Sequence, residues 1–415
     1  MTRAPGPEGR GGQGKPRSVF LCSRQLGCPA NLDLATQLHN YVVENRWAFT
    51  DAESADCIIL VSCSILVEYR RGVVATVEYL VRRHPKKRII VTGCFVEEDL
   101  VDAPNVTYVA MSRRDDFDAL FEPAVRLRDV SPVSTAEEDQ EVRSLGNEKA
   151  VFDRPYSVLV ATGCLSRCHY CLEKNLFPKV HSVPLAEVVA RCREGVRKGY
   201  KNFLIGATDV CSYGHDLGCD VTDLFAALFS GPFKGRPDLG VGLKALEPSR
   251  FIKHFPRLKP YFEKCRIDWI YLPIESGSDR VLKTMNRKYR VADFLRVVRE
   301  LRQAAPKLRI ETDFVIAYPT ETREEFEASL KLVELFDHWN LVVFGRHENT
   351  RAFTMKDEFG PEERARRCEI VRSMSAQAVR SYRPECRTLQ WVELPAEVSE
   401  PEIAVLSKQL AGKRL

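Results

Sequence analysis

The chain has 415 residues, a length that predicts two or three domains. Hydrophobic residues make up 44% and charged residues 29%, which is ordinary for a globular protein, and no apolar run is long enough to predict a membrane-spanning helix. Much of the net charge of +5 lies in the first 17 residues, so the charge of the remaining chain gives little support for nucleic-acid binding.

Residues 1–17 are rich in Gly and Pro and contain no apolar segment of a secretory signal. We therefore expect a disordered tail and a cytoplasmic protein with no membrane partner. Disulfides are rare in the reducing cytosol, so the 14 cysteines favour metal ligation or redox chemistry.

Residues 18–128 alternate between short apolar runs and helical patterns, which predicts an N-terminal doubly wound domain with a parallel sheet. The expected strands are 19–21, 58–61, 89–91 and 106–109, and the expected helices are 34–44 and 67–83. The polar stretch 129–150 that follows lacks periodicity and is predicted to be a linker.

A second alternating series over residues 151–350 predicts a partial (β/α)6 barrel, with its chemistry at the C-terminal ends of the strands. The expected strands are 157–161, 202–206, 241–245, 269–274, 309–316 and 341–344. The expected helices between them are 185–198, 221–229, 248–255, 291–304 and 323–336. Residues 351–415 are predicted to form a C-terminal extension that is helical from 361 to about 382.

Three cysteines follow the first barrel strand in "GCLSRCHYC": Cys164, Cys168 and Cys171. An iron–sulfur cluster normally takes four thiolates, so three would leave one iron open to a substrate. The alternatives are a zinc site completed by His169 or a distant ligand, and cysteines that merely pack in a core. The C-x3-C-x2-C spacing with Tyr170 resembles the radical S-adenosylmethionine (SAM) superfamily.

A second set of three cysteines lies in the N-terminal domain, each near the end of a predicted strand. Cys28 stands in "LGCPANLD", Cys63 in "ILVSCSILVE" and Cys94 in "IIVTGCFVEE". Parallel strands end at one edge of a sheet, so these cysteines are expected to converge there and to hold a second cluster. The alternative is packing, because free cysteine is among the most buried residue types.

With both sets the chain resembles the methylthiotransferase family of radical SAM enzymes, from about residue 19 to 345. The matching stretches are "GCPANLD", "VSC", "VTGC", "GCLSRCHYC", "TDVCSYGHD", "LEPS", "LPIESGSDRVLKTMNRKY" and "TDFVIAYPTET". The resemblance implies two [4Fe-4S] clusters and two uses of SAM, one to methylate a cluster-bound sulfur and one to open a substrate C–H bond. It also implies a reducing donor such as flavodoxin or ferredoxin.

The resemblance also assigns residues to the SAM pocket. Tyr170 would border the adenine, and Thr208 would line the cavity with Asp209. Glu247 would lie near the ribose or methionine, unless it is only a carboxylate at the N-terminus of a helix. Glu275, where the family usually has Gln, would contact the ribose or a cationic group, unless it is a surface carboxylate paired with Arg280 or Lys283. Arg287 would hold the SAM carboxylate or the substrate, unless it lies on a solvated helix face. Asp313 would point inward from its strand.

Departures from the family pattern concern substrate recognition. The family's "GFPGET" reads "AYPTET" here, with Ala317 and Thr320 in place of glycines, and "FGRHENT" replaces another usual turn. Residues 361–415 do not resemble the TRAM domain of the tRNA-modifying members, although their many arginines allow an anionic or peptide partner. This favours a protein, peptide or natural-product substrate. The alternatives are a tRNA adenosine, a radical enzyme that inserts sulfur without a methyl group, and a non-catalytic iron–sulfur protein.

Overall fold

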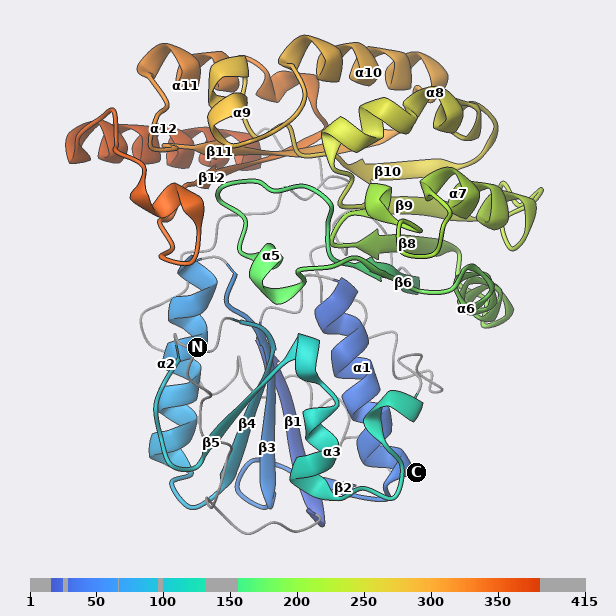
Figure 1. Ribbon diagram of the computed structural model, residues 1–415, viewed down its shortest axis with the longest axis vertical. Coiled ribbons are helices and arrows are strands. Elements are labelled where there is room, and N and C mark those ends of the chain that lie inside the picture. The colour runs from blue at the N-terminus through green and yellow to red at the C-terminus, as the bar shows by residue number, and fades with distance from the viewer. Residues whose placement is uncertain (1–15, 25–28, 66, 96–99, 131–155, 381–415) are drawn as a thin grey trace. The chain divides into compact units, whose positions relative to one another are not determined.

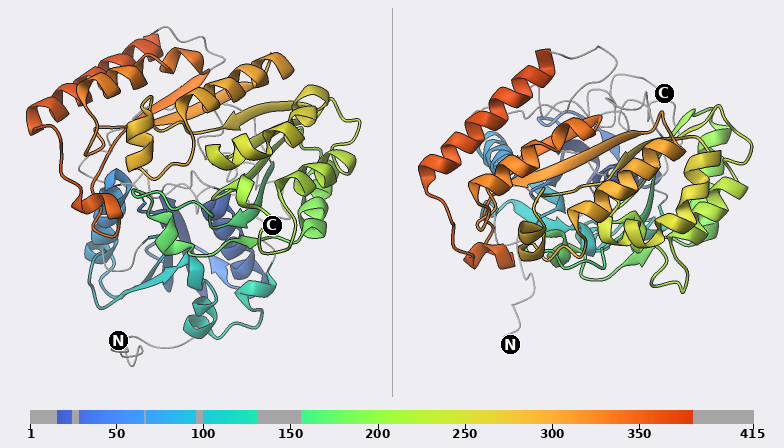
Figure 2. Two further views of the ribbon diagram at one scale, coloured as in Figure 1. Left: turned by 45° about the horizontal axis from the view of Figure 1, so that its top comes forward. Right: turned by 90° about the horizontal axis from the view of Figure 1, so that it is seen from above.

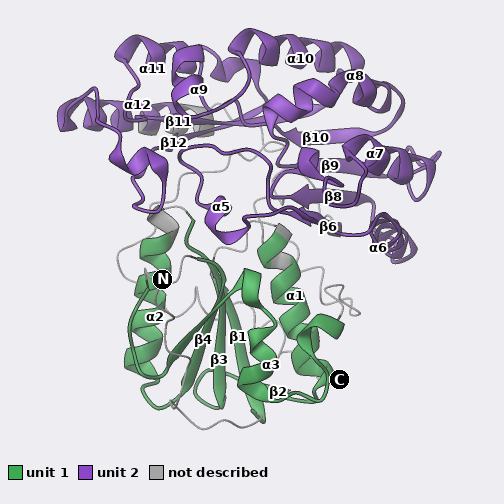
Figure 3. Cartoon of the chain, viewed as in Figure 1, with its two compact units in different colours: residues 1–146, 393–415 green, residues 147–392 purple. Residues whose placement is uncertain are grey.

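The computed structural model describes residues 16–24, 29–65, 67–95, 100–130 and 156–380. The chain divides into two compact units, residues 1–146 with 393–415 and residues 147–392 (Figure 3). The predicted tail 1–17 and linker 129–150 lie almost wholly outside the described residues. Within the described ranges, no helix combines the length and the apolar character needed to cross a bilayer.

The first unit contains a five-stranded parallel sheet with the order β2-β1-β3-β4-β5 (Figure 1). Its strands are β1 (Ser18–Arg24), β2 (Ala48–Phe49), β3 (Cys57–Cys63), β4 (Arg88–Cys94) and β5 (Val106–Ala110). Its helices are α1 (Pro29–Glu44), α2 (Val67–Arg83) and α3 (Asp116–Phe121). The sequence missed β2, which has two residues and therefore no periodicity to read.

Both faces of this sheet are covered by helices, as the unbroken apolar runs of β3 and β4 require. Ile58 and Leu60 of β3 pack with Val73 and Val77 of α2 in one core cluster. On the other side, α1 and α3 lie together, and the Tyr41 hydroxyl of α1 donates a 3.0 Å hydrogen bond to Asp118 of α3 (Figure 1). The predicted doubly wound domain is confirmed.

The second unit contains a seven-stranded sheet with the order β12-β11-β10-β9-β8-β6-β7 (Figure 1). Its parallel strands are β6 (Tyr156–Thr162), β8 (Asn202–Ala207), β9 (Gly240–Lys244), β10 (Ile267–Tyr271), β11 (Arg309–Ile316) and β12 (His338–Val343). The two-residue β7 (His181–Ser182) pairs antiparallel with β6 at one edge. Six parallel strands in chain order confirm the predicted partial barrel.

Helices cover the outer face of this sheet (Figure 2). They are α6 (Leu185–Arg197), α7 (Val221–Ser230), α8 (Pro248–Lys264), α9 (Asp279–Thr284), α10 (Val291–Ala304) and α11 (Arg323–Leu330). Two further helices are α5 (Glu173–Leu176), which follows the cysteine loop, and α12 (Pro361–Arg380), which follows β12 in the chain. The predicted helix 248–255 is too short: α8 continues through Pro256 and Pro260. Burial of Leu258 and Phe262 on its apolar face offsets the lost backbone hydrogen bonds.

Candidate active site

The three barrel cysteines lie in a loop that turns sharply away from the end of β6. Gly163 begins this turn with φ of +82°, and a Cβ there would lie 2.0 Å from the carbonyl oxygen of Lys179, so only glycine fits. The Gly163 N–H donates to the Thr208 hydroxyl at 3.1 Å, and the Leu165 N–H donates to Ser212 at 3.1 Å. Thr208 thus anchors the start of the loop to the end of β8.

The other end of the cysteine loop is tied to the segment that follows α9. The His169 N–H donates to the Met285 carbonyl at 3.0 Å, and the His169 ring nitrogen Nδ1 lies 2.8 Å from the Thr284 carbonyl. The Asn286 side chain donates to the Arg167 carbonyl at 2.6 Å. These contacts fix the segment that carries Cys168 and Cys171, and they orient the His169 ring through Nδ1.

The three thiols share a partly buried, acidic environment. Burial, together with the nearby carboxylates of Asp209 and Glu247, raises the pKa of Cys164 to about 12. Burial also raises the pKa of Cys168 and Cys171, and at Cys168 the nearby Arg287 guanidinium opposes the rise. The thiols are therefore protonated at neutral pH, and iron must displace their protons to bind.

Acidic side chains lie at the ends of neighbouring strands beside this loop. Asp209 follows β8 and accepts hydrogen bonds from the N–H groups of Cys211 at 2.9 Å and Glu247 at 3.0 Å. Its Oδ2 lies 3.8 Å from the Cys164 sulfur. Glu247 follows β9 and caps α8 through the Arg250 N–H at 3.1 Å. Glu247 thus has the helix-capping role that competed with a pocket role, while its other oxygen reaches Arg287.

Arg287 is 8% exposed and lies between these groups, which contradicts the solvated-face alternative. Its Nη1 donates to the Cys168 sulfur at 3.3 Å and lies 3.6 Å from Glu247 Oε1. Its Nη2 lies 3.3 Å from the Pro273 carbonyl and 3.6 Å from Glu275 Oε1. The contacts to oxygen atoms are longer than a strong charge-assisted hydrogen bond, so the guanidinium can still engage another carboxylate.

Glu275 has a left-handed backbone conformation, with φ of +67°. Its N–H donates to the Asp313 carbonyl and its carbonyl accepts from the Val315 N–H, so both of its backbone groups bond to β11. It is 7% exposed, and Arg280 pairs instead with Glu325, so the surface alternative is wrong. Burial raises the pKa of Glu275 to about 7, while Arg287 and the Tyr170 hydroxyl oppose the rise. The Tyr170 hydroxyl therefore lies beside the Glu275 carboxyl and near the Arg287 guanidinium.

The structure also shows a polar network on β10, β11 and β12, of which the sequence reasoning singled out only Asp313. Asn340 donates to Glu311 at 3.3 Å and to Asp313 at 2.8 Å, and the Trp269 indole donates to Glu311 at 3.2 Å. The Tyr271 hydroxyl donates to Asp313. A signal existed, because Glu311 and Asp313 are two positions apart in one strand and so share a face.

Two of the three N-terminal cysteines meet at one edge of their sheet. Cys63 and Cys94 end β3 and β4 and are directly paired in register. Gly93 permits this pairing, since a Cβ there would lie 2.0 Å from the Ser62 carbonyl oxygen. Asn31, three residues after Cys28, donates to the Ser62 carbonyl at 3.2 Å and accepts from Cys94 at 3.6 Å. Cys28 itself lies outside the described residues.

In the part of the chain that the structure describes, no group of three or more His, Cys, Asp or Glu side chains is arranged so that it could hold a single metal ion. A four-iron cluster places its thiolates farther apart than one ion does, because each sulfur binds a different iron.

Two sequence families match the chain. The radical SAM superfamily matches residues 158–333, and the uncharacterized protein family UPF0004 matches residues 21–109. The first match contains the loop of Cys164, Cys168 and Cys171, and the second contains Cys28, Cys63 and Cys94.

Several curated proteins are similar over most of their length. The threonylcarbamoyladenosine tRNA methylthiotransferase of Thermotoga maritima is 26% identical over 86% of this chain and 82% of its own. The ribosomal protein uS12 methylthiotransferase of Geobacter sulfurreducens is 28% identical over 89% of this chain and 84% of its own. A tRNA-2-methylthio-N(6)-dimethylallyladenosine synthase of Roseiflexus is 28% identical over 85% of this chain and 73% of its own.

Solved structures share the fold at lower identity. The radical SAM methyltransferase TsrM of Kitasatospora setae, with cobalamin and a [4Fe-4S] cluster bound, has a TM-score of 0.52 at 12% identity and covers 81% of this chain and 77% of its own. The cobalamin-dependent SAM radical enzyme OxsB has a TM-score of 0.51 at 12% identity, over 90% of this chain and 57% of its own.

Proposed function

Because the chain belongs to the radical SAM methylthiotransferase family, we propose that it attaches a CH3–S group to an unactivated C–H bond of a protein, peptide or natural product. SAM and [4Fe-4S] clusters are its cofactors, as they are for the family. Our proposal adds that the clusters are two and that two SAM molecules are used per product. It also assigns the residues that hold these groups.

The loop of Cys164, Cys168 and Cys171 carries the proposal, because it follows the first barrel strand and is tied at both ends. These cysteines would ligate three irons of one cluster and leave the fourth iron for SAM. When bound together, cluster and SAM supply the radical that takes a hydrogen atom from an unreactive carbon. Side-chain acids and bases cannot open such a bond, so the protein orients the cofactors.

The side chains beside the loop would orient SAM. Arg287 has room for one more carboxylate among its long contacts, so it would bind the SAM carboxylate. Glu247 and Glu275 would face the amino group or the ribose hydroxyls, Tyr170 would border the adenine, and Thr208 would hold the loop in place. The raised pKa of Glu275 lets its carboxyl donate as well as accept near neutral pH.

A second cluster would be bound by Cys28, Cys63 and Cys94 of the first unit. Cys63 and Cys94 end two adjacent strands, and β1, which precedes Cys28, pairs with β3 where the strand order reverses. Ligands bind open parallel sheets at this point, outside the carboxyl ends of the strands. An electron donor such as flavodoxin or ferredoxin would reduce the clusters.

We favour a protein, peptide or natural-product substrate because the described arginines of α12 are occupied. Arg366 pairs with Glu363 at 2.9 Å, Arg367 pairs with Glu321 at 2.6 Å, and Arg364 bonds the Phe344 carbonyl at 3.0 Å. Guanidinium groups in such contacts are poorly available to RNA phosphates. The names of the relatives include both substrate classes, so a tRNA substrate is the other outcome of the test.

Iron analysis tests the two-cluster assignment. Anaerobically reconstituted wild-type protein should contain about eight irons per chain, and a Cys164→Ala/Cys168→Ala/Cys171→Ala variant about four. A variant of Cys57 and Cys192, which are buried cysteines outside both sets, should keep about eight and serves as the control. If the triple variant holds no iron, the N-terminal cysteines do not bind a cluster.

Mass spectrometry tests the substrate. Digested tRNA and co-expressed peptides should be searched for an added CH2S group, and its appearance only in tRNA would overturn the favoured class. The reaction should release both 5′-deoxyadenosine and S-adenosylhomocysteine. Formation of 5′-deoxyadenosine without S-adenosylhomocysteine would indicate sulfur insertion without methyl transfer.

A further inference from the structure

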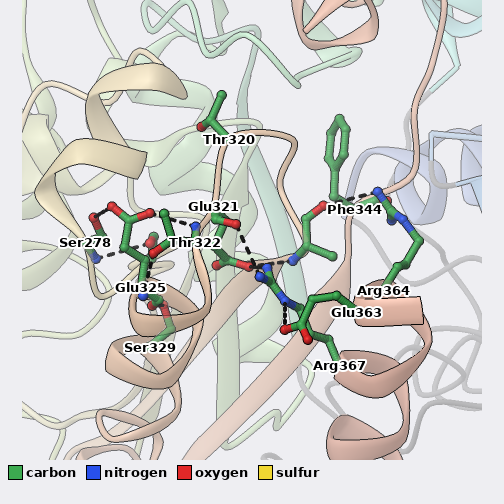
Figure 4. A network of polar contacts seen from close by, with 12 residues as sticks. Ser278, Thr320, Glu321, Thr322, Glu325, Ser329, Phe344, Glu363, Arg364 and Arg367 are labelled. Atoms are coloured by element: carbon green, nitrogen blue, oxygen red, sulfur yellow. Dashed lines mark hydrogen bonds and ion pairs between the residues drawn. The ribbon is translucent and has the colours of Figure 1, made fainter. Parts of the chain in front are cut away.

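The helix α12 makes buried polar contacts with residues 317–322, the turn that follows β11 (Figure 4). Arg367 Nη1 donates to Glu321 Oε2 at 2.6 Å, and the two side chains are 1% and 0% exposed. Arg367 Nη2 also donates to the Glu321 carbonyl at 3.3 Å. A buried, hydrogen-bonded pair of this kind fixes the helix and the turn relative to each other.

The contacts converge on the backbone of Ala317, which is in the left-handed region with φ of +55°. Residues other than glycine rarely adopt this conformation, because the Cβ crowds the backbone. Glu321 Oε2, the atom that Arg367 binds, accepts the Ala317 N–H at 2.8 Å. Arg364 of α12 donates to the Ala317 carbonyl at 3.4 Å. Both polar groups of this residue are thus held by contacts that depend on α12.

The conformation of Ala317 sets the direction of Tyr318, which is fully buried. The Tyr318 ring packs edge-on against Phe344 at 5.1 Å and against Tyr170 at 6.5 Å between ring centroids. Tyr170 lies between Cys168 and Cys171 in the cysteine loop. A continuous path of contacts therefore joins α12 to the loop through the turn and Tyr318.

We propose that Arg367, Glu321 and Arg364, here called the α12 clamp, are positioning residues for the SAM pocket: they hold Ala317 in its left-handed conformation and so keep Tyr318 against Tyr170. The inference rests on the proposed function, which places SAM at the cysteine loop. The family pattern has glycine at this position, and glycine adopts such a φ at no steric cost. In this chain the clamp supplies the constraint that alanine requires.

The test is a rescue experiment. Arg367→Gln should raise the KM for SAM about tenfold in reductive cleavage with dithionite, measured as 5′-deoxyadenosine, because Tyr170 loses its support. Adding Ala317→Gly should return the KM to within about threefold of wild type, because glycine needs no clamp. Arg366→Gln is the matched control: the described contacts of Arg366 include Glu363 but not the turn, so the KM should not change.

Hydrogen–deuterium exchange provides a readout in protein without cofactors. Arg367→Gln should accelerate exchange of the Ala317 amide, and Arg366→Gln should not; equal rates in the two variants would overturn the proposal. An unchanged KM in Arg367→Gln, or no rescue by Ala317→Gly, would overturn it too. If Arg367→Gln does not fold, Arg364→Gln replaces it, with an expected rise of about threefold and the same rescue. A wild type that forms no 5′-deoxyadenosine refutes the proposed function instead, and the exchange data still decide the clamp.

Discussion

Arg287 and Arg367 are both buried arginines of the second unit, yet their surroundings differ. Arg367 is 1% exposed and lies 2.6 Å from Glu321 and 3.0 Å from Glu363. Arg287 is 8% exposed, but its distances to Glu247, Glu275 and Cys168 are all 3.3 Å or more. The Arg367 guanidinium makes short contacts with two carboxylates, whereas the Arg287 guanidinium lies 3.6 Å from each of its two carboxylate neighbours.

This difference separates a structural charge from a binding charge. A guanidinium with short contacts on two sides has little to gain from a ligand, and removing it leaves a buried carboxylate without a partner. A guanidinium with several long contacts is oriented but still able to form a bidentate pair with a planar anion. Burial alone would have placed the two arginines in one class, so contact length is the more informative quantity.

The largest expected effect is on stability, for Arg367→Met. Because Glu321 would remain buried without its partner, we expect the free energy of unfolding to fall by about 3–5 kcal/mol, measured by urea denaturation. Arg366→Met, at a side chain that is 35% exposed, should cost no more than about 0.5 kcal/mol. A loss below about 1 kcal/mol for Arg367→Met would remove the distinction between this pair and a surface ion pair.

The long strands and helices of this fold could be predicted from the sequence, because each has a local apolar pattern, whereas short elements such as β2 could not. The six parallel barrel strands and the two long helices of the first unit follow apolar patterns that a single segment reveals. Helix ends were less predictable: the proline at position 256 indicates a stop, and only the packing of Phe262 explains why α8 continues.

The site was predictable where chemistry follows a strand end and was not where it depends on pairing across the fold. Cys164, Glu247 and Glu275 each follow a predicted barrel strand, and a parallel sheet brings such positions to one edge. The pairing of Glu321 with Arg367, 46 positions apart, depends on how α12 packs, which no local pattern encodes. The same holds for Asn340, whose partners follow from the register of β11 and β12.

The next effect concerns ligand binding, for Arg287→Lys. Lysine keeps the positive charge between Glu247 and Glu275 but cannot form two parallel hydrogen bonds to a carboxylate. We expect the KM for SAM to rise on the order of tenfold to thirtyfold, with a change in unfolding free energy of less than about 1 kcal/mol. The two quantities come from 5′-deoxyadenosine assays and urea denaturation. A large loss of stability at an unchanged KM would place Arg287 in the same class as Arg367.

The smallest effect tests whether the Glu275 carboxylate competes with the SAM carboxylate for the Arg287 guanidinium. Burial raises the pKa of Glu275 to about 7, so the carboxyl is largely neutral below that pH and ionised above it. When ionised, it attracts the guanidinium 3.6 Å away and opposes an incoming carboxylate. The KM for SAM in the wild type should therefore rise about threefold to fivefold between about pH 6 and pH 8.

Glu275→Gln, which restores the residue usual in the family, should remove this pH dependence while keeping the side-chain shape. A carboxyl whose pKa is raised on folding favours the folded state at low pH and loses that contribution as the pH rises through the folded-state value. The variant should accordingly gain stability over the wild type above about pH 7 and not below about pH 5. The same pH dependence in both proteins would show that another group titrates, and that Glu275 does not compete with SAM for Arg287.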